Sequence, residues 1–302
     1  MDLLFRLLGM LGIIGLGILA RRTGILTPPR TALLNAVTFY VALPALIFTA
    51  TYDQNPADLA SLDLLGGVWL TMAATLGLAW LVHQRITVDS RRSVAIVQSF
   101  HSNMGYLGLP LVTAGLGSPA AGQAAVILGI GALTHTLVTT TTLVRINGTT
   151  TDPRRELGRL AKNPIVLTLA AGAAVATVAW TPPTSAIEGL SVVAQGALPL
   201  ALLCIGASLK VDVSGGDLPI AGSVIGLKVL AMPAIAFLVF TALGAPPVTI
   251  AAAVVMFGTP SAVVTYIYAG ELGGDANLAS ANVLATTIVG VVTLTLLLFL
   301  FG

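Results

Sequence analysis

The chain has 302 residues, of which 56% are hydrophobic and only 9% are charged, and its mean hydropathy is +0.96. Soluble domains carry roughly a quarter charged residues, so this composition excludes an ordinary water-soluble protein. The net charge of +2 is small and favours no nucleic-acid partner. Because the chain has a single cysteine, it has neither a disulfide framework nor a cysteine-based metal site.

Ten apolar runs are long enough to cross a bilayer as helices, since one crossing takes about 20 mostly apolar residues. The runs are continuous, which excludes the short alternating strands of a closed barrel. The sequence therefore predicts an all-α integral membrane protein with ten transmembrane helices. We expect these spans near residues 3–20, 32–51, 64–82, 93–116, 120–144, 164–180, 189–209, 219–242, 247–269 and 278–301.

The basic residues between the spans predict the orientation of the chain. Twelve of the fourteen Lys and Arg residues fall in or beside the loops after spans 1, 3, 5 and 7, and the opposite loops carry acidic residues instead. Because loops rich in Lys and Arg stay in the cytoplasm, we expect both termini on the extracytoplasmic side of the cell membrane. The twelve are Arg21, Arg22, Arg30, Arg85, Arg91, Arg92, Arg145, Arg154, Arg155, Arg159, Lys162 and Lys210.

A polar stretch after span 5 divides the chain into two groups of five spans. The predicted divisions are a first five-helix repeat over 1–146, a cytoplasmic connecting loop over 147–162 and a second five-helix repeat over 163–302. Since five is odd, the second group enters the membrane in the opposite orientation, and similar halves would form an inverted repeat. The tripeptide Ala-Leu-Pro occurs in span 2 and again in span 7, at the same place in each half.

Spans 4 and 9 carry residues that interrupt a helix. Span 4 contains the sequence HSNMGYLGLP over 101–110, and span 9 contains GTPS over 258–261. Proline and glycine unwind a helix, and non-helical backbone at membrane depth is tolerated only inside protein or beside a watery cavity. Interrupted spans at matching places in two halves point to a transporter's binding site. The N-termini of such half-helices favour an anionic substrate.

These motifs resemble those of the auxin efflux carrier family and its bacterial and archaeal relatives, which share a superfamily with bile acid–sodium symporters. The resemblance rests on NMGYLGLP over 103–110, on Pro260-Ser261 and on YAGEL over 268–272. It implies two inverted five-helix repeats in which spans 1, 2, 6 and 7 form a scaffold. The remaining spans would form a transport domain, in which spans 4 and 9 unwind and cross, and which moves organic anions by an elevator mechanism.

The resemblance also implies that Asn103 and the Pro260-Ser261 pair hold the substrate's carboxylate. The sequence departs from the plant carriers at Ser102, where they have proline, and in its short central loop, so auxin itself is not the expected substrate. The predicted substrate-binding residues, mostly from the two interrupted spans, are His101, Ser102, Asn103, Gly105, Tyr106, Pro110, His135, Lys228, Gly258, Pro260, Ser261 and Thr265.

Lys228 and His135 are the candidates that lie outside the interrupted spans. Lys228 is the one charge placed deep in a predicted span, where an ionisable residue is a functional hypothesis by default. It would attract an anion or take the place of a coupling cation, or else pair with backbone carbonyls. His135 lies midway along span 5 and would contact the substrate or bond a neighbouring helix. Because no Asp or Glu falls in mid-span, carboxylate-based proton coupling is disfavoured.

The sequence thus predicts a secondary transporter of small organic anions that is not an enzyme and has no cofactor. Coupling to Na⁺, coupling to H⁺ through His101 or His135, and uniport all stay open, as does a homodimer. The first alternative is a sodium-coupled symporter of the bile-acid type. An intramembrane enzyme would need a paired Asp, a Ser–His pair or a metal cluster in the spans. A channel is disfavoured, because inverted halves with broken helices suit alternating access.

Overall fold

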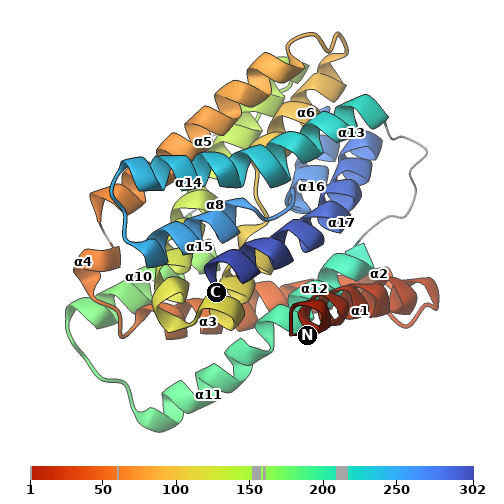
Figure 1. Ribbon diagram of the computed structural model, residues 1–302. Helices are drawn as coiled ribbons and strands as arrows, with labels where there is room; N and C mark the ends of the chain where they lie inside the picture. The colour runs from red at the N-terminus through yellow and green to blue at the C-terminus, as the bar shows by residue number, and fades with distance from the viewer. Residues whose placement is uncertain (1, 60, 152–157, 159–160, 209–216) are drawn as a thin grey trace.

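The computed structural model describes residues 2–59, 61–151, 158, 161–208 and 217–302. Within these ranges every regular element is a helix, and there is no strand (Figure 1). Much of the predicted connecting loop lies outside the described residues, including Arg154, Arg155 and Arg159. Lys210, in the loop after the seventh predicted span, also lies outside them.

The helices follow one another in the order that the apolar runs predict. Those of the first half are α1 (Asp2–Arg22), α2 (Pro28–Val37), η1 (Thr38–Ala42), α3 (Leu43–Thr51), α4 (Pro56–Leu59), α5 (Leu62–His83), α6 (Asp89–Phe100), η2 (Met104–Gly108), α7 (Leu109–Leu116) and α8 (Ser118–Asn147). Those of the second half are α10 (Pro164–Thr177), α11 (Thr184–Gln195), α12 (Ala197–Ser208), α13 (Leu218–Ile225), η3 (Gly226–Ala231), α14 (Met232–Ala242), α15 (Pro247–Phe257), α16 (Val264–Glu271) and α17 (Ala276–Phe301).

Among the described residues, six helical stretches are long and apolar enough to cross a membrane. They are Pro28–Thr51, Pro56–His83, Ser118–Asn147, Thr184–Ser208, Leu218–Ala242 and Ala276–Phe301. Shorter apolar helices occupy the places of predicted spans 4, 6 and 9, at Met104–Leu116, Pro164–Thr177 and Pro247–Phe257. The structure therefore confirms an all-helical membrane protein, while the count of ten spans stays a prediction.

Local sequence explains where several helices begin. Helices α10 and α15 start with a proline, whose missing N–H costs nothing in the first turn of a helix. The side chain of Asn163 accepts a hydrogen bond from the Ile165 amide at 2.9 Å, and that of Asp275 accepts one from the Leu278 amide at 3.0 Å. These caps satisfy N–H groups that a helix leaves without an internal partner.

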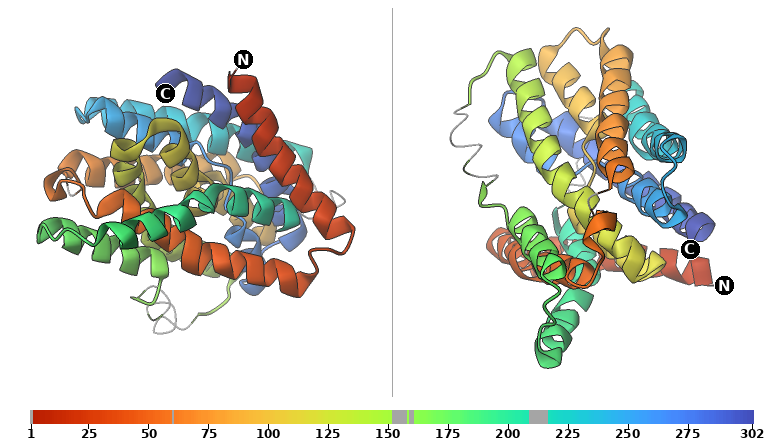
Figure 2. Two further views of the ribbon diagram at one scale, coloured as in Figure 1. Left: turned by 90° about the horizontal axis from the view of Figure 1, so that it is seen from below. Right: turned by 90° about the vertical axis from the view of Figure 1, so that its left-hand side faces the viewer.

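The helices form two layers, which the views in Figures 1 and 2 separate. One layer contains α1, α2–α3, α10 and α11–α12, which lie at the bottom of Figure 1 and contact one another. The other contains α5 to α8 and α13 to α17. We call these the lower layer and the upper layer. The layers meet where α8 contacts α3 and α10, and where η2 contacts α12.

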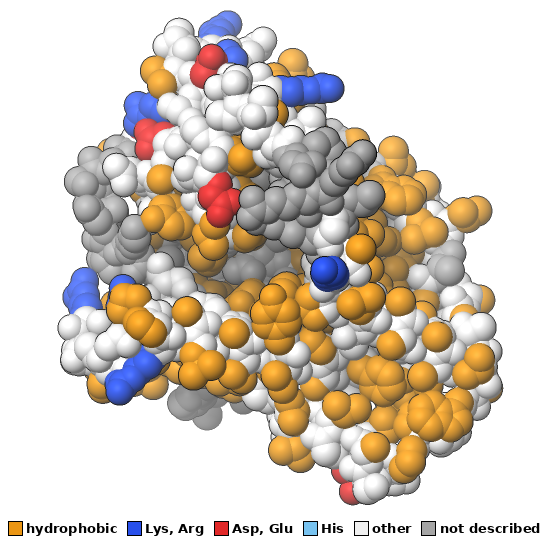
Figure 3. All heavy atoms as spheres, turned by 180° about the vertical axis from the view of Figure 1, so that it is seen from behind, with side chains coloured by type: hydrophobic (Ala, Val, Ile, Leu, Met, Phe, Trp, Pro, Cys, Tyr) orange, Lys and Arg blue, Asp and Glu red, His pale blue; other side chains and the backbone are white. Residues whose placement is uncertain are grey.

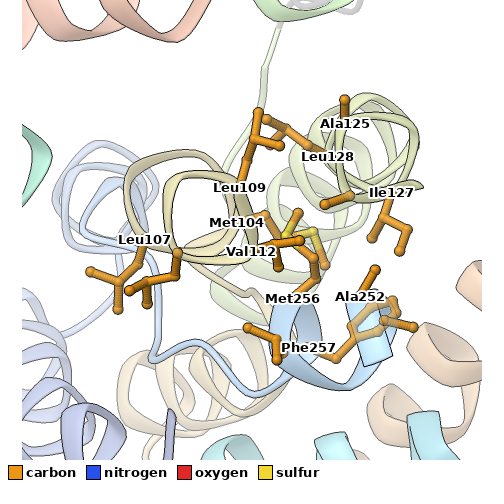
Figure 4. Packing of buried hydrophobic residues seen from close by; sticks show 14 of the residues in the cluster. Met104, Leu107, Leu109, Val112, Ala125, Ile127, Leu128, Ala252, Met256 and Phe257 are labelled. Carbon is orange, nitrogen blue, oxygen red and sulfur yellow. The ribbon is translucent and has the colours of Figure 1, made fainter. Parts of the chain in front are cut away.

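The main apolar core extends through both layers, and Figure 4 shows the part of it where η2–α7, α8 and α15 meet. Met104, Ile127 and Phe257 come from these three elements and are all at least 98% buried. Bringing the two interrupted helices against α8 removes their apolar faces from the surroundings. The core therefore fixes the elements that carry the candidate site.

The outer surface agrees with a membrane environment. Large exposed hydrophobic side chains occur on helices of both layers, including Leu70, Leu167 and Leu296. On the face drawn in Figure 3, Lys and Arg side chains lie at the top, along the left edge and at one place near the centre, while hydrophobic side chains cover much of the lower right.

Candidate substrate site

The two predicted interruptions are present. Helix α6 ends at Phe100 and the next helical turn starts at Met104. Helix α15 ends at Phe257, and α16 starts at Val264. Pro260 lies in the second gap and has no N–H, so it cannot donate to the carbonyl of Met256, four residues back. The Thr259 hydroxyl donates to that carbonyl instead, at 2.8 Å.

The two unwound segments pair with each other, although about 160 residues separate them in the chain. Ser102 and Ser261 form an isolated antiparallel bridge. The Asn103 amide donates to the Pro260 carbonyl at 2.9 Å, and the Ala262 amide donates to the His101 carbonyl at 3.0 Å. These bonds satisfy backbone groups that the breaks would leave unpaired away from water.

Side chains of α6, α16 and α17 hold this crossing in place. The Ser261 hydroxyl donates to the Gln98 carbonyl at 2.6 Å. The Gln98 side chain donates to the Thr265 hydroxyl at 3.0 Å and to the Ala279 carbonyl at 2.9 Å. The Thr286 hydroxyl accepts from the Ser261 amide at 3.3 Å. Ser261 and Thr265 therefore stabilise the paired unwound segments through bonds to α6 and α17. Neither residue lines the cavity described next.

A cavity of about 430 Å³ lies beside the crossing and has walls from both layers. Six of the predicted residues line it: His101, Ser102, Asn103, Gly105, Tyr106 and His135. The lower layer contributes residues that the sequence analysis did not select, namely Asn35, Phe39, Asn163, Cys204, Ile205 and Ser208. These residues could have been suspected because polar side chains occur near the ends of predicted spans 2 and 7. Nothing in the sequence, however, placed these ends opposite span 4.

Two helix N-termini face this cavity. The first turn of η2 contributes Met104, Gly105 and Tyr106 to its wall, and the start of α16 contributes Val263 and Val264. The first N–H groups of a helix have no internal partner and carry partial positive charge. Among the described residues the lining includes no Lys, Arg, Asp or Glu, so the helix ends set the local electrostatics. An anion fits this arrangement.

Asn103 adds an amide side chain to the cavity wall. It is 6% exposed and lines the cavity, and its side chain does not cap η2. The amide can therefore both donate a hydrogen bond to a ligand in the cavity and accept one from it.

The two histidines form a stacked pair at the cavity wall. Their ring centroids lie 4.4 Å apart with an interplanar angle of 15°. Nδ1 of His101 lies 2.8 Å from the Thr139 hydroxyl, and Nε2 of His135 donates to the Phe100 carbonyl at 3.2 Å. Each ring is thus held by a contact at one nitrogen and borders the cavity.

The other predicted residues lie away from this cavity. Lys228 is completely buried on η3, and its Nζ donates to the Phe257 carbonyl at 2.8 Å. Gly258 and Pro260 lie in the unwound segment behind the wall. Pro110 lines a second cavity of about 420 Å³, between α3, α7 and the junction of α11 with α12. No group of three or more His, Cys, Asp or Glu side chains among the described residues can hold a metal ion.

Comparisons with known proteins identify relatives that are named as transporters. A family model described as "Membrane transport protein" matches residues 3–156 and 154–298. A protein of Rhizobium meliloti (strain 1021) named "Putative malonate transporter" is 29% identical, over 96% of this chain and 92% of its own length. An "Uncharacterized transporter" of Methanothermobacter thermautotrophicus is 26% identical, over 96% of this chain and 95% of its own length.

Proposed function

Because the chain belongs to the membrane transport protein family, whose members resemble auxin efflux carriers, we propose that it is a secondary transporter of small organic anions. The observation that carries this proposal is the convergence of two helix N-termini and the Asn103 amide on one cavity. Partial positive charge and a hydrogen-bond donor, away from water, suit a carboxylate. The name of the Rhizobium meliloti relative makes malonate the first substrate to test.

The proposed architecture is ten spans in two inverted five-helix repeats. The breaks at the fourth and ninth expected spans fall at corresponding places in the two halves, which supports a repeat. In the proposed division, the lower layer is the scaffold and the upper layer is the transport domain. The connection over 147–162 stays a prediction.

The positions of the two cavities support alternating access. Both lie at the boundary between the layers, one beside η2 and the other beside α7. The first is lined by Ser208 at the end of α12, and the second by Ser191 in α11. With Lys- and Arg-rich loops in the cytoplasm, the first cavity lies toward the cytoplasm and the second toward the outside. We therefore propose an elevator-type movement of the upper layer, in a cell-membrane protein with both termini outside.

Direct measurement on purified protein in liposomes tests the substrate class. Malonate is expected to give saturable uptake and a solid-supported-membrane current. Malonamide is its matched neutral control, because it keeps the shape and removes the charge. A response to malonamide and other neutral solutes, without one to any organic acid, would overturn the anion proposal.

The same assay separates the coupling alternatives. Replacing Na⁺ by choline leaves uptake unchanged in a carrier without sodium coupling and abolishes it in a bile-acid-type symporter. A pH gradient at zero membrane potential drives uptake only where protons are coupled. Size measurement in detergent decides whether the protein is a homodimer.

A further inference from the structure

The breaks in α6 and α15 each leave a carbonyl oxygen without its helical donor. In an unbroken helix the carbonyl of Phe257 would accept from the amide of Ser261, four residues on. That amide instead donates to Thr286. The carbonyl of Phe100 also lacks its helical donor, because the residue four positions later, Met104, lies beyond the break. An unpaired carbonyl away from water is costly, and these two also carry the negative end of their helix dipoles.

A basic side chain from a neighbouring helix binds each of these carbonyls. Nε2 of His135, on α8, donates to the Phe100 oxygen. Nζ of Lys228, on η3, donates to the Phe257 oxygen at 2.8 Å. The two helix C-termini of the crossing are therefore both capped by nitrogen donors, while its two N-termini face the cavity.

Lys228 is the stronger of the two caps, because an ammonium can neutralise the carbonyl end of a helix. Its side chain is completely buried, so it does not extend to the lipid–water boundary. The salt bridges of the described residues involve Arg91 and Arg92, and none involves Lys228. Its partner among the described residues is thus the carbonyl at the end of α15 and not a carboxylate.

We propose that Lys228 is a positioning residue: a built-in cation that fixes the carbonyl end of α15, so that the unwound segment holds the N-terminus of α16 against the substrate cavity. The chain then supplies covalently what a bound monovalent cation would otherwise supply at this carbonyl. Substrate does not touch Lys228, which acts through Phe257 and the segment after it. The transport readout of this inference rests on the proposed function, whereas its binding readout does not.

Removing the side chain and returning its cation from solution tests the proposal. Lys228→Ala leaves a space the length of a propylammonium ion beside the Phe257 carbonyl. Thermal unfolding of this variant in detergent is measured against propylammonium chloride, with N-methylglucamine chloride keeping the ionic strength constant. Saturable stabilisation of the variant is expected, with none for the wild type. Lys228→Met, which fills the space with an apolar chain, is the matched control and is not expected to respond.

Transport supplies the second readout. Lys228→Met is expected to lower the malonate transport rate about tenfold or more, and propylammonium to restore part of the loss in Lys228→Ala. Lys162→Ala, which removes an exposed lysine, leaves the rate unchanged.

The proposal is overturned if Lys228→Ala is purified but no ammonium ion stabilises it, or if Lys228→Met transports at about the wild-type rate. Should Lys228→Ala not fold, Lys228→Met decides alone: a lower transport rate together with weaker malonate binding supports the proposal, and unchanged malonate affinity overturns it. If the wild type transports no organic anion but Lys228→Ala still binds propylammonium, the proposed function fails and the role of Lys228 stands.

Discussion

The amide of Asn103 makes this residue the sharpest single test of the cavity. Asn103→Ala removes an amide that does not cap η2, so the stability of the protein should change little. A hydrogen bond to a charged ligand is worth about 1.5–3 kcal/mol, so the Kd for malonate should rise roughly tenfold or more. Isothermal titration in detergent measures this change. Asn277→Ala, the same substitution at an exposed residue, should leave the Kd unaltered.

The two serines of the crossing should behave differently although both are buried. Ser261→Ala loses the 2.6 Å bond to the Gln98 carbonyl, which leaves a buried acceptor unpaired and should cost about 1–3 kcal/mol of stability. The Ser102 hydroxyl contacts the Met232 sulfur at 3.5 Å, which is a weak acceptor. Ser102→Ala should therefore keep nearly full stability and weaken substrate binding. Denaturant titration measures the stability of each variant, and malonate titration measures its substrate affinity. Equal loss of stability in the two variants would contradict this interpretation.

Chemistry that is local in sequence could be predicted residue by residue, and contacts across the fold could not. The breaks near Asn103 and Pro260 could be predicted, because proline and glycine disfavour a helix at their own positions in the chain. The contact of Ser261 with substrate stays a prediction, and the sequence could not show that its hydroxyl bonds to Gln98, a partner 163 positions away. The wall formed by Asn35 and Ser208 was missed for the same reason, since it exists only once the layers pack.

At the scale of elements, α1 and α12 pack with their backbones almost touching. A Cβ added to Gly206 would collide with the Ile14 carbonyl, and one added to Gly17 would lie 2.9 Å from the Ala207 amide nitrogen. Small residues allow such approach between membrane helices. Gly206→Ala should force α1 and α12 apart and lower stability by about 1–3 kcal/mol.

Gly12→Ala is the matched control for this contact, because a Cβ there meets no atom within 4 Å. Thermal unfolding of both variants in the same detergent measures the difference. Equal melting temperatures would show that the close contact does not contribute to stability.

At the scale of the whole molecule, the two cavities should change accessibility in opposite directions. In a Cys204→Ala background, which removes the single cysteine, Ser208→Cys reports on the first cavity and Thr113→Cys on the second. An impermeant thiol reagent should label position 208 from the cytoplasmic side and position 113 from the outside. Conditions that raise labelling at one position should lower it at the other, and parallel changes would exclude alternating access between these cavities.

The order and type of the helices were predictable because apolar runs of membrane-spanning length leave few alternatives. The layer to which each helix belongs was available only through the resemblance to a known family. Hydropathy treats α3 and α5 alike, whereas the structure places them in different layers. That difference depends on side-chain shape, which periodicity does not record.

Hydrocarbon groups form much of the boundary between the layers. A Cβ added to Gly105 would meet Leu128 of its own layer and Leu43 and Ile165 of the other at ordinary van der Waals distances, so apolar side chains of both layers surround this residue. Attraction between such groups has no preferred direction, so one set of neighbours can be exchanged for another by sliding. A seam of directed polar bonds would have to rupture together in a medium that offers no water as a temporary partner. An apolar boundary of this kind would therefore let the proposed movement of the upper layer against the lower layer exchange contacts without unfolding either layer.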